Sequence, residues 1–190
     1  MPTTICYSLF AVRYLRKLRK IMKPRLFCLS IFCFLLPVSI SSEQKNLVQK
    51  SQKAQPFALY DLNDNLVTYS DFKEKKILIL SFFATWCEPC VKEIKELEEF
   101  SQLISSSAIE ILLISTDRGK KKKIVNFVKN HQIKLKIIRD IYGIVQKAYK
   151  VNAIPALFLI DKSGDIVFQQ EGYSEKTVEK IKLKIKEFIE

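Results

Sequence analysis

An apolar run, Ile77–Phe83, is followed four residues later by the pair Cys87 and Cys90. The run reads ILILSFF, which is typical of a strand that is covered on both faces of its sheet. After Cys87 the apolar residues recur every three or four positions, as in an amphipathic helix. The chain is therefore expected to hold both cysteines in a tight turn between a central strand and a helix.

Strand and helix patterns alternate on both sides of this turn. The expected strands are residues 57–60, 66–69, 109–115, 135–138, 156–161 and 166–171, the last two joined by a hairpin turn. The expected helices are residues 120–130, residues 142–149 and a last helix that Ser174 caps. Phe127, Tyr142 and Tyr149 have helical spacing and are predicted core residues. This order predicts an α/β fold of three layers, α/β/α, with a mixed central sheet.

The first 41 residues have the features of a targeting segment. Residues 26–40 form an apolar run of 15 residues, with seven basic and no acidic residues before it and serines at its end. At about 1.5 Å per residue the run spans about 22 Å, short of the roughly 30 Å hydrocarbon core of a membrane. We expect residues 1–41 to be a cleaved signal peptide, whose true start could be Met22, with an uncleaved N-terminal membrane anchor as the alternative.

The rest of the chain is expected to form one domain. Residues 42–55 are polar and are predicted to be a flexible leader, and residues 56–190 are long enough for one hydrophobic core. The net charge of +12 invites a nucleic-acid interpretation. However, residues 42–190 hold 25 basic and 20 acidic residues, so their net charge is only +5. That is an ordinary protein surface, and no nucleic-acid partner is expected.

The placement of the cysteines suits thiol chemistry. Unpaired backbone N–H groups and the helix dipole stabilise a thiolate at the start of a helix. Cys87 is therefore the predicted nucleophile, and Cys90, one turn further along, is the predicted resolving thiol. Pro89 fits the first helical turn, where its missing N–H is not needed. Glu88 adds a negative charge beside Cys87, which works against the thiolate. We therefore expect the reduction potential of the Cys87–Cys90 couple to lie toward the reducing end of the range.

A structural zinc site is the main alternative use of this cysteine pair. Such a site needs four ligands, and beyond residue 41 the chain offers only Cys87, Cys90 and His131 as sulfur or imidazole ligands. We expect no metal, and no cofactor other than a redox-active Cys87–Cys90 disulfide. Inert packing cysteines are a second alternative. His131 is expected at the surface, and the lysines at 120–123 are expected to be a solvated face or a contact for an acidic partner.

Residues 82–90, FFATWCEPC, together with Ile154-Pro155 before a strand and Gly164 in the turn after it, resemble the thioredoxin superfamily. The resemblance is closer to the extracytoplasmic thiol-disulfide oxidoreductases of the ResA/TlpA type. It implies a thioredoxin-like domain over residues 56–190, with an N-terminal β extension and an inserted strand–helix element. It also implies reduction of protein disulfides in the periplasm or elsewhere outside the cytoplasm, and for several members a role in cytochrome c maturation.

The resemblance also implies roles for individual residues. Ile154-Pro155 is implied to be a cis bond facing the disulfide, although X-Pro bonds in general are cis in only about 5–6% of cases. Trp86, Glu88 and Pro89 are implied to line the substrate site with them, and packing of the turn is an equal alternative for Trp86. The implied partners are a protein disulfide, such as that of apocytochrome c, and a membrane thiol that donates electrons. A monomer is expected.

Glu93, three residues after Cys90, matches a family position that is linked to proton handling. The alternative is a solvated helix residue, because Glu93 lies in a run of Glu and Lys. Ser81 occupies the strand position at which cytoplasmic thioredoxins carry a buried Asp that assists proton transfer. A hydroxyl cannot act as that base, so Glu93 is the predicted proton acceptor.

Two other functions stay open. In a thiol peroxidase of the peroxiredoxin type, Thr and Pro stand three and seven residues before the reactive Cys, where this chain has Ala84 and Leu80. The third possibility is a non-catalytic, thioredoxin-like binding module.

Overall fold

The centre of the fold is strand β4 (Ile77–Phe83), whose seven residues are all buried. The computed structural model describes residues 52–104 and 108–189, which belong to one compact unit. In it, β4 pairs in parallel with β5 (Ile109–Ser115) and antiparallel with β7 (Ala156–Ile160). The predicted central strand is thus confirmed. A strand that is paired on both sides and buried on both faces needs an almost wholly apolar sequence, and this strand has one.

The described strands form one mixed sheet in the order β1-β8-β7-β4-β5-β6-β2-β3. The remaining strands are β1 (Gln52–Lys53), β2 (Ala58–Asp61), β3 (Leu66–Thr68), β6 (Lys136–Arg139) and β8 (Asp165–Glu171). The β2–β3 hairpin extends the sheet beyond β6, as expected of an N-terminal β extension. The predicted hairpin between β7 and β8 is confirmed.

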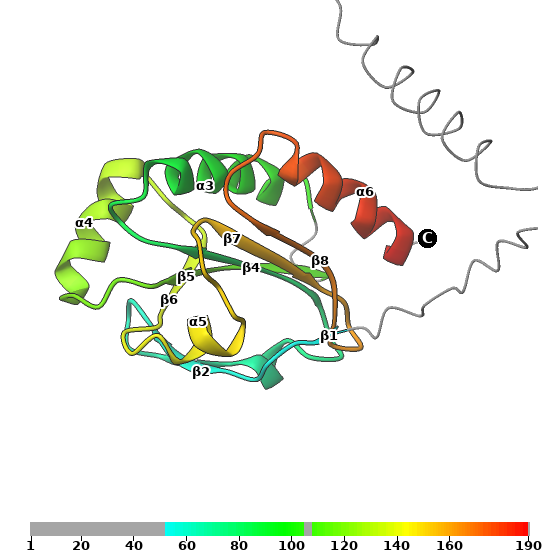
Figure 1. Cartoon of the computed structure of the whole chain (residues 1–190), viewed down its shortest axis with the longest axis horizontal. Coiled ribbons are helices and arrows are strands. Elements are labelled where there is room, and N and C mark those ends of the chain that lie inside the picture. Colours follow the sequence, from blue (N-terminus) through cyan, green and yellow to red (C-terminus); the bar gives the residue numbers. More distant parts are fainter. Residues whose placement is uncertain (1–51, 105–107, 190) are drawn as a thin grey trace, which may run out of the picture. The chain divides into compact units, whose positions relative to one another are not determined.

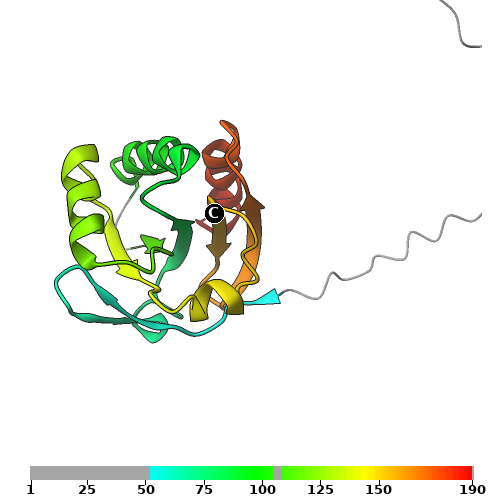
Figure 2. The same ribbon diagram turned by 60° about the vertical axis from the view of Figure 1, so that its left-hand side comes forward.

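Helices cover both faces of the sheet (Figures 1 and 2). Helices α3 (Glu88–Ser101), α4 (Lys121–His131) and α6 (Thr177–Ile189) pack on one face. Helix α5 (Ile144–Ala148) and the 3-10 turn η2 (Tyr69–Asp71) pack on the other. The three-layer α/β/α arrangement with a mixed sheet is therefore confirmed.

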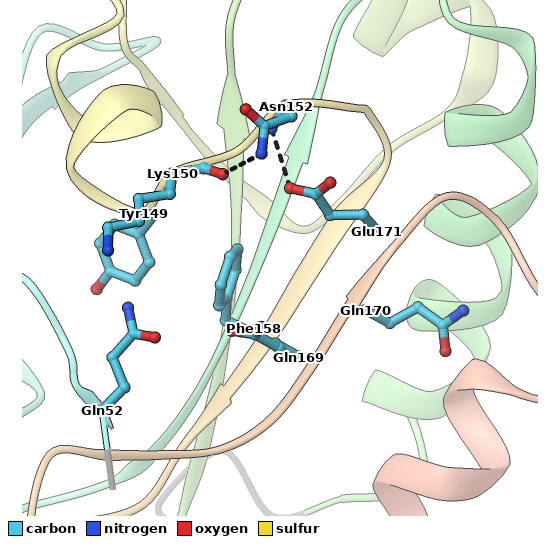
Figure 3. A pocket seen from close by; sticks show the side chains of 8 residues that line it. All are labelled: Gln52, Tyr149, Lys150, Asn152, Phe158, Gln169, Gln170 and Glu171. Carbon is cyan, nitrogen blue, oxygen red and sulfur yellow. Dashed lines mark hydrogen bonds between the residues drawn. The ribbon is translucent and has the colours of Figure 1, made fainter. Parts of the chain in front are cut away.

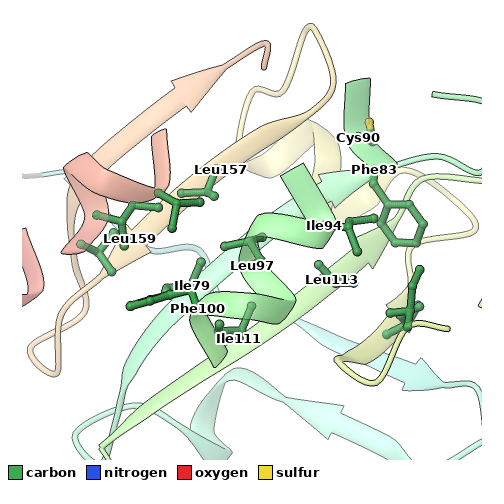
Figure 4. Close-up of a cluster of buried hydrophobic side chains, with 14 of the residues drawn as sticks. Ile79, Phe83, Cys90, Ile94, Leu97, Phe100, Ile111, Leu113, Leu157 and Leu159 are labelled. Atoms are coloured by element: carbon green, nitrogen blue, oxygen red, sulfur yellow. The ribbon is translucent and has the colours of Figure 1, made fainter. Parts of the chain in front are cut away.

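The pleat of β4 sends alternate side chains to the two faces. Ile77 and Ile79 belong to the apolar cluster under α3, α4 and α6, while Leu78 and Leu80 belong to the cluster on the α5 face. Figure 4 shows part of the first cluster, with residues of α3 against the sheet. The same alternation places Ser81 on the face that α3 covers.

The predicted leader is partly wrong. Lys53 pairs with Asp165 at the start of β8, and the backbone N–H of Ala54 donates to the carbonyl of Gly164 at 2.9 Å. Short polar segments give no periodic signal, so the sequence does not show that this one adds a strand to the edge of the sheet. The predictions for residues 1–51, including the signal peptide, the anchor and the start at Met22, lie outside the described residues. In the part of the chain that the structure describes, every helix is too short or too polar to span a membrane.

Helix α5 is shorter than the predicted helix over residues 142–149. Gly143 has a φ of 68°, in the left-handed region, so the helix begins only at Ile144. As a result Tyr142 is 78% exposed, and its predicted place in the core is wrong, whereas Phe127 and Tyr149 are buried as predicted. Helix α6 likewise begins at Thr177, three residues after its predicted cap, Ser174.

Candidate active site

Cys87 is the residue that caps the N-terminus of α3. Its backbone is extended, and its Sγ accepts a hydrogen bond from the backbone N–H of Cys90 at 3.2 Å. Pro89 stands in the first turn of the helix, as predicted. A sulfur held at the N-terminus of a fourteen-residue helix meets unpaired N–H groups and the positive end of the helix dipole. This arrangement stabilises a thiolate at Cys87.

Cys87 and Cys90 form a disulfide. Both are buried in this oxidised form, but Cys87 keeps 5% of its surface exposed and Cys90 none. The order of exposure agrees with an outer nucleophile and an inner resolving thiol. Within residues 52–104 and 108–189, no three His, Cys, Asp or Glu side chains gather in a way that could hold a metal ion.

Glu93 lies one turn after Cys90 on the buried face of α3. It is only 1% exposed, so its interpretation as a solvated helix residue is wrong. Ser81, from β4, donates a hydrogen bond of 2.7 Å to Oε1 of Glu93. The other carboxyl oxygen, Oε2, is buried and has no hydrogen-bond partner among the described residues. The strand thus supports one oxygen and leaves the other free for a proton.

The environment of Glu93 favours its protonated form. The pKa of Glu93 is raised from 4.5 to about 7. Burial is the main cause, the nearby charge of Glu96 adds to it, and the Ser81 hydrogen bond opposes it. A carboxyl group with a pKa near neutrality can both accept and return a proton at neutral pH. Cys90 and Glu93 are three residues apart on one helix, so they share a face.

The segment before β7 contributes to the same end of the sheet. The Ile154-Pro155 peptide bond is cis, as the family resemblance implied. Ile154 packs against the apolar cluster that contains both cysteines, and the carbonyl of Pro155 accepts a hydrogen bond from the N–H of Gly172 at 2.7 Å. This segment is therefore held on one side by that cluster and on the other by Gly172, the residue that follows β8.

Three further predicted site residues lie on the surface of the turn. Glu88 and Pro89 are exposed in the first turn of α3. Trp86 is 71% exposed, so its interpretation as packing for the turn is wrong. An exposed indole beside a buried disulfide is a surface on which another molecule can pack.

Asp117 is a site residue that the sequence analysis missed. Its carboxylate accepts hydrogen bonds from the N–H and Oγ1 of Thr85, both at 2.8 Å, and from Oγ of Ser115 at 3.0 Å. Asp117 is 5% exposed and pairs with Lys123 at 3.4 Å. It fixes the turn that leads from β4 to Cys87. Its position two residues after a buried parallel strand was the available signal, since polar residues at such strand ends commonly serve sites.

Tyr173 is a second missed residue. Its hydroxyl donates a hydrogen bond of 2.6 Å to Glu96, and this bond, more than its burial, raises the pKa of Tyr173 to about 12. Tyr173 follows Gly172, whose N–H donates a hydrogen bond to the carbonyl of Pro155. Its bond to Glu96 therefore links the end of β8 to α3, the helix that carries Glu93. No pattern in the sequence points to this pairing over 77 residues.

The other singled-out residues lie in ordinary surroundings. His131 is exposed, with its ring centroid 4.5 Å from that of Phe127. Two of the four lysines at 120–123 form ion pairs within the chain, Lys121 with Asp64 and Lys123 with Asp117.

Comparison with known proteins identifies the family. The model of the Redoxin family matches residues 49–185. The chain belongs to the Redoxin family. The thiol-disulfide oxidoreductase ResA of Bacillus cereus is 33% identical over 141 residues, which are 74% of this chain and 78% of that protein. ResA of Bacillus subtilis is 31% identical over 123 residues, 65% of this chain and 68% of that protein. This member of the Redoxin family is accordingly a thiol-disulfide oxidoreductase of the ResA/TlpA type.

Solved structures agree on the fold. A thiol-disulfide oxidoreductase from Bacteroides fragilis superposes with a TM-score of 0.62 at 22% identity, over 70% of this chain and 98% of that chain. A thioredoxin-like protein from Porphyromonas gingivalis gives 0.60 at 26% identity, over 73% of this chain and 94% of that one. The fold is therefore thioredoxin-like.

Proposed function

We propose that this oxidoreductase reduces protein disulfides outside the cytoplasm, with Glu93 as the group that takes the proton of Cys90. The observation that carries the proposal is the buried Glu93 carboxyl group, with one oxygen unpartnered, one turn behind a disulfide at the start of a helix. Such a carboxyl group serves a thiol that must lose its proton in a place that water does not reach.

The reaction proceeds in two exchanges. The Cys87 thiolate attacks one sulfur of the substrate disulfide, forming a mixed disulfide and releasing the other substrate sulfur as a thiolate. Cys90 then gives its proton to Glu93 and attacks Sγ of Cys87, which forms the Cys87–Cys90 disulfide and releases the second substrate thiolate. The substrate gains two electrons and the cysteine pair loses two. A thiol donor at the membrane must afterwards reduce the pair again.

Glu88 supports the proposed direction of electron transfer, from the cysteine pair to the substrate disulfide. Its carboxylate is in the first turn of α3, where it opposes the stabilisation of a Cys87 thiolate. A less stabilised thiolate makes the reduced form less favoured, so the protein donates electrons more readily. We expect Glu88→His to raise the reduction potential, by about 30 mV for each 1.4 kcal/mol of thiolate stabilisation. A wild-type potential near the roughly −120 mV of a strong oxidant would contradict the reductase assignment.

The proposed site of action is outside the cytoplasm, and the proposed partners are a protein disulfide and a membrane thiol. The basic and apolar segment before residue 42 supports export across the cytoplasmic membrane. The family resemblance supports cytochrome c maturation, in which the substrate would be the disulfide of apocytochrome c. An electron donor in the membrane fits the same location.

Trapping of the mixed disulfide tests the function. Cys90→Ser keeps the nucleophile and removes the resolving thiol, so it should accumulate a Cys87-linked substrate that mass spectrometry identifies. Cys87→Ser is the matched control and should trap nothing. The wild-type protein should reduce insulin with dithiothreitol as donor, whereas a non-catalytic binding module would not. Rapid consumption of hydrogen peroxide without insulin reduction would instead indicate the thiol peroxidase.

A further inference from the structure

A groove of about 490 Å³ lies beside the active-site segments and has no part in the thiol exchange. The residues that define it are Arg118, Tyr142, Lys147, Lys150 and Asn152, and we call it the basic groove. They come from the segment after β5, from the region of α5 and from the segment before β7. Two stretches of the chain that are distant in sequence, one at Arg118 and the other over residues 142–152, therefore build it together.

Two residues of the basic groove are close in sequence to residues that support the redox site. Arg118 directly follows Asp117, which holds the N–H of Thr85 two residues before Cys87. Asn152 stands two residues before Ile154, which packs against the apolar cluster that contains both cysteines. The chain thus connects the groove to the redox site at two places, once after β5 and once before β7.

The groove is positive. Arg118, Lys147 and Lys150 are all exposed, and none of the three forms an ion pair with another described residue. No acidic side chain lines the groove within the described part of the chain. Other exposed lysines of the described chain, such as Lys92 and Lys180, also form no ion pair, so the groove is distinguished by having three such bases around one hollow.

Neighbouring carboxylates are already engaged elsewhere. Asp140 is 1% exposed and accepts from the N–H groups of Ile144 and Gln146 at the start of α5. Glu171 accepts from the N–H of Asn152 at 2.9 Å. Figure 3 shows this bond in an adjacent hollow, which Lys150 and Asn152 also line. Within residues 52–104 and 108–189, the bases of the basic groove therefore have no carboxylate paired with them.

Aromatic surface accompanies the charge. Tyr142 lines the groove and is 78% exposed, and Trp86 is 71% exposed beside Cys87. Exposed aromatic residues together with Arg are enriched at the centres of protein interfaces, where they bury area at little cost in conformational entropy. The groove can thus hold a peptide chain as well as attract its charge.

We infer that the basic groove binds an acidic segment of the protein substrate next to the disulfide that Cys87 attacks. The inference rests on the proposed function and adds a substrate class to it. Complementary charge mainly raises the rate of productive encounter, and its effect falls as salt screens it. The groove would select among disulfides of equal reactivity by the charge of the residues beside them.

Three disulfide peptides test this selection. They share one Cys-containing core and differ only in flanking residues, which are Asp and Glu in one, Lys in the second and uncharged in the third. At low ionic strength the wild-type protein should reduce the acidic peptide with a kcat/KM about tenfold above that of the neutral one. In about 1 M salt, where the screening length is about 3 Å, this preference should disappear.

The double variant Lys147→Glu, Lys150→Glu tests whether the preference for the acidic peptide arises in the basic groove. It should lose the preference for the acidic peptide, with about a tenfold fall in kcat/KM, and reduce the neutral peptide at the wild-type rate. Lys180→Glu with Lys186→Glu on α6 makes the same change of charge at exposed positions away from the groove and should keep the preference. Equal loss in both double variants would overturn the inference, because net charge would then explain it.

A cysteine-free acidic peptide provides a measurement that does not depend on variants. It should inhibit reduction of the acidic peptide by the wild-type protein, and an equally long neutral peptide should not. Equal rates for all three substrate peptides would overturn the groove and leave the reductase proposal intact. If none of the three is reduced, the proposed function itself fails.

Discussion

The hydroxyl of Ser81 donates a hydrogen bond of 2.7 Å to Oε1 of Glu93, joining the central strand to the helix that begins at the cysteines. Both residues are almost wholly buried. The bond stabilises the charged form of a carboxyl group whose burial favours the neutral form. The strand and the helix thus set the proton affinity of Glu93 between them.

Ser81→Ala should raise the pKa of Glu93 further above its value of about 7. A hydrogen bond to a charged group contributes about 1.5–3 kcal/mol and one pKa unit corresponds to about 1.36 kcal/mol, so we expect a rise of about one to two units. Titration of the Glu93 carboxyl carbon by NMR measures it. Ser115→Ala is the control, because this buried hydroxyl bonds to Asp117 instead. A lower Glu93 pKa in Ser81→Ala would contradict the role of the bond.

The stability of the oxidised protein should fall as the pH rises from about 4.5 to 7. The pKa of Glu93 is raised in the folded state, so between these values the folded protein holds a proton that the unfolded chain has released. The free energy of unfolding then decreases with pH by about 3 kcal/mol in total and becomes level above about pH 7.

Glu93→Gln should remove this pH dependence, because the amide does not titrate in this range. Urea unfolding at a series of pH values measures it. Glu99→Gln removes an exposed carboxylate from the same helix and is the matched control, whose curve should run parallel to that of the wild type. An unchanged slope in Glu93→Gln would show that another group causes the dependence.

In the reduced protein, Cys87 should react with iodoacetamide about tenfold or more ahead of Cys90. Cys87 caps the helix and retains exposed surface in the disulfide form, whereas Cys90 is fully buried. Peptide mapping by mass spectrometry after timed quenching gives both rates. If Cys90 is alkylated first, the two thiols have the opposite roles.

Asp117→Asn should destabilise the oxidised protein by about 2 kcal/mol. The substitution puts an NH₂ group among hydrogen-bond donors from Thr85 and Ser115, so at least one buried group loses its partner. Urea unfolding at fixed pH measures the loss. Lys123→Ala is the control: its side chain is 57% exposed, so removing this ion pair should cost less than about 1 kcal/mol. Equal losses would assign the effect to the ion pair.

Much of the central fold could be predicted, because it follows from local periodicity. β4 and β5 have the predicted bounds, and α3 begins at the cysteines as expected. Hydrophobic runs and helical spacing can be recognised from consecutive residues alone. Burial on both faces also restricts a strand to almost wholly apolar residue types. The sheet edge was less predictable, since β1 has only two exposed polar residues, whose pairing depends on β8.

The sequence by itself determined the chemistry: two thiols in a turn before a helix, with an acidic residue one turn beyond. Only the tertiary structure decided which polar residues serve it. Glu93 and Glu99 both lie in a run of Glu and Lys, yet one is buried beside Ser81 and the other is exposed. Likewise Asp117 and Tyr173 acquire their roles from contacts with Thr85 and Glu96. The burial and the proton affinity of a residue depend on which distant parts of the chain pack against it. The residues next to it in the sequence do not reveal those contacts.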